Sequence, residues 1–106
     1  MLFRSEATST VHARHLYSVA LDLERLETGR DSIRHALRRE GIGTGVHYLP
    51  AHLHPYYRGL LPYGPGSFAD AEWIGERTLS LPMGPFLDEQ DVKDVITAVC
   101  KVTARP

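Results

Sequence analysis

Residues 41–58 constrain the possible folds of this chain more than any other stretch, because glycine and proline recur through them. Glycine occupies every second position from Gly41 to Gly45, a spacing that predicts a strand approached closely by other backbone. Pro50 ends that strand. More prolines follow and make long regular elements improbable, although Pro55 suits the first position of a short helix. The longer elements are therefore expected on either side of this stretch.

Patterns of apolar residues predict the flanking elements. Apolar residues alternate along a strand and recur every three to four positions along a helix. The expected elements are a strand at 15–21, a turn at 22–29, a helix at 30–40, a strand at 41–48, a short helix at 55–58, a helix at 68–78, a strand at 79–83 and a final helix after Leu87. This order predicts an α/β (α+β) two-layer sandwich, in which a small three-stranded sheet carries helices on one face.

Capping residues and apolar stripes set the expected ends and inner faces of the helices. Thr28 is expected to cap the first long helix and Asp88 the last, because short oxygen-bearing side chains accept hydrogen bonds from free backbone amides. Gly41 stops the first of these helices. The expected inner faces are Ile33, Ala36 and Leu37 in the first helix, Ala71, Trp73 and Ile74 in the second, and Val92, Val95, Ile96 and Val99 in the third.

Size and composition indicate one globular domain. The chain has 106 residues and a net charge of -1 with no basic stripe, which argues against a nucleic-acid partner. Its apolar runs are too short to span a membrane, and no secretory signal is visible, so we expect a cytoplasmic protein. Residues 1–11 are predicted to be a disordered or vector-derived leader and 12–106 the domain. Cys100, the only cysteine, is expected to be a buried thiol in a reducing compartment.

Histidine, tyrosine and arginine gather between Gly41 and Arg58. Loops on a rigid scaffold present such side chains to ligands, because a core would leave their polar groups unpaired. Regular helices and strands do not require this pattern. The segment therefore holds the candidate site.

Five motifs in the same order resemble those of the DegT/DnrJ/EryC1/StrS sugar aminotransferases. They are His-Leu-Tyr at 15–17, Arg-Asp at 30–31, Gly-Ile-Gly-Thr-Gly-Val-His-Tyr at 41–48, His-Leu-His-Pro-Tyr-Tyr at 52–57 and Leu-Ser-Leu-Pro-Met at 79–83. The resemblance covers His15 to about Val102. It implies the C-terminal small domain of a fold type I enzyme, a domain that approaches the active site across a dimer interface.

The resemblance also implies pyridoxal phosphate as the cofactor of the full-length family. Its Schiff-base lysine belongs to a large domain that this chain lacks. The only lysines here, Lys93 and Lys101, fall on the polar side of the final helix, which favours solvation over a nucleophilic role. We therefore expect no cofactor on this chain, no catalytic residue and no transamination by the chain alone. The implied partners are the missing large domain or a homologous subunit.

The resemblance implies four substrate-binding residues for a nucleotide-sugar, which are His47, Tyr48, His52 and Arg58. Plainer interpretations stay open: His47 could bond a nearby carbonyl at a strand end, and Arg58 could be solvated on a helix turn. A zinc site built from three imidazoles is a further alternative, because His54 lies beside the other two histidines in sequence. A stand-alone interaction or dimerisation module is the alternative function. We expect the chain to self-associate through a strand edge and the face near Val46, Tyr48 and Leu49, to bind its missing half, or to swap its leader segment between copies.

Overall fold

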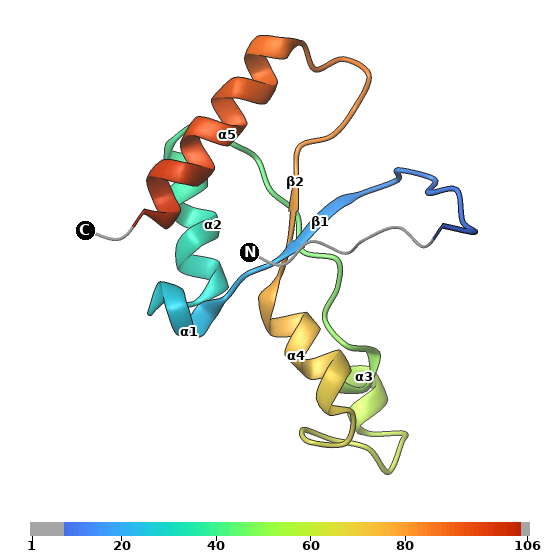
Figure 1. The fold of residues 1–106 in the computed structure, drawn as a ribbon. Helices are drawn as coiled ribbons and strands as arrows, with labels where there is room; N and C mark the ends of the chain where they lie inside the picture. The colour runs from blue at the N-terminus through green and yellow to red at the C-terminus, as the bar shows by residue number, and fades with distance from the viewer. Residues whose placement is uncertain (1–7, 105–106) are drawn as a thin grey trace.

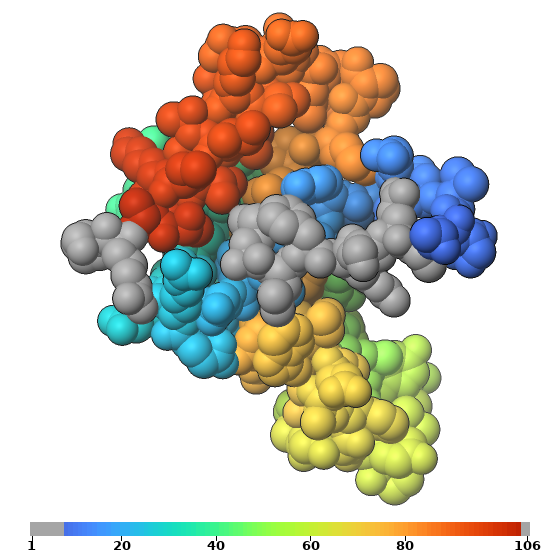
Figure 2. Space-filling view, viewed as in Figure 1, coloured from blue at the N-terminus to red at the C-terminus, as the bar shows by residue number. Residues whose placement is uncertain are grey.

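The computed structural model describes residues 8–104, in which two regions are distinct (Figure 1). We call β1, β2, α1, α2 and α5 the body, and residues 51–77 the arm. The elements are β1 (Tyr17–Ala20), α1 (Leu23–Leu26), α2 (Arg30–Arg39), the 3-10 helix η1 (Ala51–Leu53), α3 (Pro55–Arg58), α4 (Ala69–Arg77), β2 (Thr78–Leu81) and α5 (Glu89–Thr103). Figure 2 shows the arm projecting away from the body. Of the leader predicted at residues 1–11, residues 1–7 lie outside the described residues.

The sheet has two strands, not the three that the sequence predicts. β1 and β2 pair antiparallel, with Val19 opposite Leu79. The predicted strand at 41–48 contributes a single bridge, in which the amides and carbonyls of Gly45 and Ser80 exchange hydrogen bonds of 2.8 and 3.0 Å. Beyond Gly45 the chain turns toward α4, where Pro50 packs against the helix.

The core lies in the body, where α2 packs against α5 and β2. Its buried apolar side chains come from both strands, the segment after β1 and both long helices: Val19, Leu21, Ile33, Leu37, Leu79 and Ala98. Burying a side chain the size of leucine stabilises a fold by roughly 1.5–3 kcal/mol. The predicted stripe of α2 is therefore confirmed, and it anchors the body. None of the helices within residues 8–104 is long and apolar enough to cross a membrane.

Helix ends were predicted correctly at α5 and incorrectly at α2. Asp88 accepts hydrogen bonds from the amides of Gln90 and Asp91, at 2.7 and 2.9 Å, and Asp91 returns a bond to the Asp88 amide. This reciprocal capping confirms the predicted start. At α2 the cap residue is Gly29 and no side chain caps the helix, so Thr28 is not the cap. The predicted turn at 22–29 contains the short helix α1.

α5 turns a different face inward from the one predicted. Ala98 is buried, and Val95 and Val99 are half-buried, whereas Val92 and Ile96 are exposed. The small Ala98 side chain allows α2 and α5 to approach closely, which sets the rotation of the helix. On the rotated helix Cys100 is exposed. The prediction of a buried thiol is therefore wrong.

The inner face predicted for α4 is also wrong. Ala71, Trp73 and Ile74 are all exposed, whereas Gly75 is buried. An added Cβ at Gly75 would lie 2.5 Å from Cδ of Pro50. α4 therefore uses a glycine to admit the chain that enters the arm, and it leaves its large apolar side chains uncovered by this chain.

Polar contacts join the arm to the body. The Arg30 guanidinium donates to the carbonyl of Gly75 at 2.6 Å. Arg77, which is buried, bonds to the Glu24 carboxylate of α1, and its guanidinium lies 4.7 Å from the ring centroid of Trp73. Glu24's own backbone amide and the Arg77 guanidinium lower the pKa of the Glu24 carboxyl. These arginine contacts fix the base of the arm.

Candidate functional site

His47 lies two residues after the bridge between Gly45 and Ser80. Its Nδ1 is 2.8 Å from the Ser80 hydroxyl, and its half-buried ring meets the edge of Tyr48 at a centroid distance of 4.8 Å. The peptide bond between His47 and Tyr48 is cis. Tyr48 is 70% exposed. The structure therefore brings one anchored imidazole and one open phenol together at the surface.

Ser80 was not singled out from the sequence. Its side chain is buried on β2, and its hydroxyl is 2.9 Å from the hydroxyl of Ser18 on β1. A serine at a buried strand position needs a hydrogen-bond partner. That requirement was the available signal, but the sequence alone does not say that the partner is His47.

His52 lies inside the arm, not on its surface. Its ring is buried, and its Nε2 is 2.9 Å from the Glu72 carboxylate of α4. The ring also meets the edge of Phe68 at a centroid distance of 4.9 Å. The same Glu72 carboxylate accepts hydrogen bonds from the amides of Gly66 and Phe68, at 2.8 and 3.2 Å. His52 thus belongs to a polar cluster that closes the loop before α4.

The hydrogen bonds of this cluster also set the charge state of its carboxylate. The amide of Gly66, followed by His52, holds the pKa of Glu72 below its ordinary value, because both stabilise the ionised form. Glu72 was not singled out from the sequence. No spacing in the chain links it to residue 52, since the two are joined only by the return of α4.

Arg58 ends α3 and is exposed, as is His54 just before that helix. Within the described residues neither side chain has a hydrogen-bond or ion-pair partner. α3 packs against η1, which carries His52. The four predicted residues therefore fall into an anchored pair at 47 and 48, a buried histidine and an open arginine.

The described residues do not support the zinc alternative. They contain no group of three or more histidine, cysteine, aspartate or glutamate side chains that could hold a metal ion. His47 and His52 instead bond to Ser80 and Glu72.

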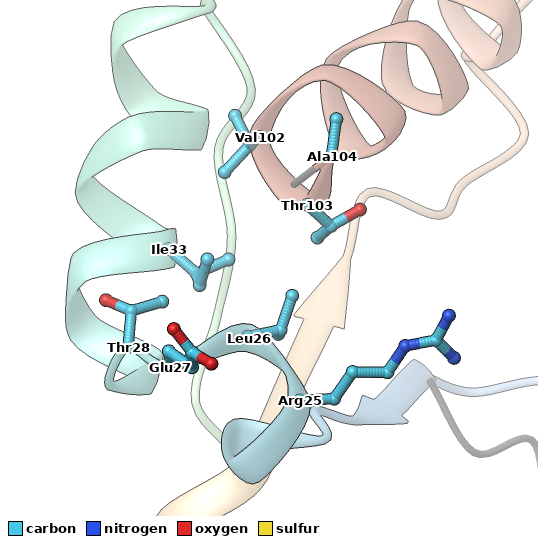
Figure 3. Close-up of a pocket in the computed structure, with 8 residues that line it drawn as sticks. All are labelled: Arg25, Leu26, Glu27, Thr28, Ile33, Val102, Thr103 and Ala104. Carbon is cyan, nitrogen blue, oxygen red and sulfur yellow. The ribbon is translucent and has the colours of Figure 1, made fainter. Parts of the chain in front are cut away.

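Several hollows are lined by residues in and beside the body, none of them a predicted site residue. One, of about 260 Å³, lies among α1, the start of α2 and the end of α5, and is lined by residues 25–28, 33 and 102–104 (Figure 3). Another is an apolar groove of about 570 Å³ between the strands and α5, lined by Tyr17, Leu81, Pro82, Met83, Val92 and Ile96 among others. As far as residues 8–104 are concerned, the candidate site is thus an open surface outside these hollows.

Neither lysine lies where a Schiff base could form. Lys101 Nζ is 2.7 Å from the carboxylate of Glu40, which follows α2, and Lys93 is exposed on α5. A nucleophilic lysine needs a desolvated pocket or a neighbouring cation to lower its pKa. The residues present therefore do not fit the lysine role that pyridoxal phosphate requires.

The DegT/DnrJ/EryC1/StrS aminotransferase family matches residues 2–100, and the chain belongs to this family. The spore coat polysaccharide biosynthesis protein SpsC of Bacillus subtilis is 43% identical over 89 residues, which cover 83% of this chain and 23% of SpsC. The chain thus spans about a quarter of that relative's length.

Solved structures of the family share the fold. DesV of S. venezuelae, in complex with a ketimine intermediate, matches 87% of this chain and 23% of its own, at 38% identity and a TM-score of 0.74. A sugar aminotransferase of Streptococcus pneumoniae in its PMP form matches 85% of this chain and 22% of its own, at 28% identity and a TM-score of 0.74. The described fold therefore matches one part of these larger aminotransferase structures.

Proposed function

We propose that this chain is the C-terminal small domain of a pyridoxal-phosphate-dependent nucleotide-sugar aminotransferase. The observation that carries the proposal is the pair at 47 and 48, in which an anchored imidazole and an exposed phenol stand together beside the sheet edge. The likeness to SpsC, a polysaccharide biosynthesis protein, and to the sugar aminotransferase of Streptococcus pneumoniae supports a sugar-derived substrate. The Schiff-base lysine must come from another domain or subunit, so the chain alone does not transaminate.

Each predicted residue has a role that its geometry permits. His47 Nε2 can hydrogen-bond a sugar hydroxyl or a phosphate oxygen, and Tyr48 offers an apolar ring with a polar tip. Arg58 can bind a phosphate through two parallel hydrogen bonds. His52 is sequestered by Glu72, so we assign it the positioning of the arm in addition to the substrate contact inferred from the family resemblance. Pyridoxal phosphate, held elsewhere, would supply the electron sink.

A chimera tests this proposal. Residues 12–104 would replace the matching segment of DesV, and amino transfer would be measured for His47→Ala, Arg58→Lys and His54→Ala. We expect a loss in kcat/KM of about tenfold or more for the first two, which is about 1.4 kcal/mol of transition-state stabilisation. His54→Ala is the matched control, because His54 is exposed and unpaired in the described residues. Equal kinetics for all three variants would contradict the assignment.

A second function is favoured by the uncovered apolar surface. The groove beside α5 and the aromatic side chains of the arm are open, and surfaces of this kind mark interfaces. We propose that the chain binds a large domain or a homologous subunit there, or associates with itself near Tyr48 and Leu49. Sedimentation at micromolar concentration tests the self-association. A mass that rises with concentration supports it, and a monomer at every concentration contradicts it.

A further inference from the structure

His47 is held by two residues, Ser80 and Gly45, that lie in the motifs at 79–83 and 41–48 but have no role toward His47 assigned from the sequence. The Ser80 hydroxyl lies 2.8 Å from Nδ1, and Gly45 leaves the space that the ring occupies. A Cβ added at Gly45 would lie 2.5 Å from Cε1 of His47, which is closer than real atoms approach. The same two residues form the backbone bridge between β2 and the segment at 41–48. The residues that form the backbone bridge therefore also hold the His47 ring.

We propose that Ser80 and Gly45 are positioning residues that fix the tautomer and the orientation of His47. In this arrangement the Ser18 hydroxyl donates to Ser80, and the Ser80 hydroxyl donates to Nδ1 of His47. Nδ1 is then the acceptor, so the ring carries its proton on Nε2. Within the described residues Nε2 has no hydrogen-bond partner, which leaves an N–H donor for a ligand.

The hydroxyl inventory is met by this direction of donation and equally by its reverse, so the direction is part of the proposal. Each serine has one proton to donate and two lone pairs that accept. Ser80 is buried, so its hydroxyl must satisfy itself with the two neighbours it has, at 2.8 and 2.9 Å. Ser18 is exposed and can accept from water. Successive donation from Ser18 through Ser80 to the imidazole polarises each bond and strengthens the next.

A ligand that meets Nε2–H must offer an acceptor. For the nucleotide-sugar of the proposed function, on which this step rests, the acceptor is a sugar hydroxyl or a phosphate oxygen. Ser80 thus acts through His47 and does not touch the substrate. The backbone at Gly45 lies outside the left-handed region, so alanine there changes the room for the ring without backbone strain.

The test measures the tautomer of His47 in the 106-residue chain by long-range nitrogen–proton correlation NMR spectra. The spectra are recorded at a pH well above the ordinary pKa of histidine, so that the imidazoles are neutral. We expect His47 to favour the Nε2–H tautomer about fivefold more than the exposed His54 does, which is the ratio that a typical net hydrogen bond supplies. Ser80→Ala and Gly45→Ala should each bring His47 to the ratio of His54. Amide spectra of the core residues Leu37 and Leu79 report whether each variant keeps its fold.

Three outcomes overturn the inference: a wild-type His47 with the ratio of His54, a preference for Nδ1–H, or a bias that survives in both folded variants. Ser18→Ala is the matched control, because it removes a hydroxyl and leaves Ser80 able to donate; we expect a smaller loss of bias than with Ser80→Ala. The wild-type measurement needs no variant to fold. It also needs no substrate, so a failed chimera assay with an intact bias would refute the proposed function alone.

Discussion

The body and the arm are held together by opposite means. The body buries six apolar side chains in one core, and only a few of its polar groups bridge separate elements. The arm buries two polar side chains, His52 and, at its base, Arg77, and its loop is closed by Glu72. Leu53 is half-buried, and the other large apolar side chains of the arm are exposed: Tyr56, Tyr57, Leu60, Leu61, Tyr63, Phe68, Trp73 and Ile74.

This difference indicates which region folds by its own burial. Apolar burial is non-directional and grows with area, so the body is stable wherever its helices and strands can meet. A carboxylate cluster depends on direction and on its charge state. The arm is therefore expected to keep its form through a few polar contacts, and to gain stability when a partner surface covers its aromatic side chains.

The largest expected effect is in the core of the body. Leu37 is 1% exposed, whereas Leu60 in the arm is 63% exposed. Leu37→Ala should lower the free energy of unfolding by about 2–5 kcal/mol, because the lost methyl groups leave a cavity. Leu60→Ala makes the same chemical change and should cost less than about 0.5 kcal/mol. Denaturant midpoints measure both, and similar losses for the two leucines would break the comparison.

The next effect concerns the arm. Glu72→Gln removes the charge that accepts from Gly66, Phe68 and His52, and charged acceptors form the stronger hydrogen bonds. We expect the amides of Gly66 and Phe68 to exchange with solvent about tenfold faster, with little change in the body. Asp70→Asn, on the same helix, is the control and should leave both amides unchanged. Equal exchange in the two variants would show that the carboxylate does not close the loop.

The same cluster should respond to pH. The pKa of Glu72 is lowered in the folded chain, first by the amide of Gly66 and then by His52. Its contribution to stability is therefore fully present above the ordinary pKa of glutamate, and is lost as the pH falls through the lowered value. Chemical shifts of the Gly66 amide should follow that loss. Glu72→Gln should make the Gly66 shift insensitive to acid.

The sequence predicted the body better than the arm because local apolar patterns determine the body, whereas polar contacts between distant residues hold the arm. The stripe containing Ile33 and Leu37 and the cap at Asp88 are local patterns, so neighbouring residues suffice to find them. The rotation of α5 depends on how closely α2 approaches Ala98, which no local pattern shows. The prediction of a third strand was wrong because the chain beyond Gly45 turns toward α4, where Pro50 packs, and therefore does not continue to pair with β2.

In the candidate site, too, local motifs could be read from the sequence and long-range partners could not. His47 could be found because the run from residue 41 carries the family's motif. Its partner Ser80 is 33 residues away along the chain, and the pairing of His52 with Glu72 spans 20 residues. Both partners became visible only when the strands and α4 brought distant segments together. Long-range polar pairs leave no periodic signal in the sequence, unlike a buried stripe.

The smallest expected effect is a polar contact inside the body. Lys101 on α5 donates to Glu40 at the end of α2 across 2.7 Å, and its side chain is 65% exposed. Because burial already holds these helices together, and water screens the pair, a double-mutant cycle of Lys101→Met and Glu40→Gln should give a coupling of about 0.2–1 kcal/mol. The coupling should shrink toward zero at about 1 M salt, where the screening length is only about 3 Å. A coupling above about 2 kcal/mol that survives salt would exceed what an exposed pair supplies. It would mean that the body, like the arm, depends on directed polar contacts, and the contrast between the two regions would then be one of degree.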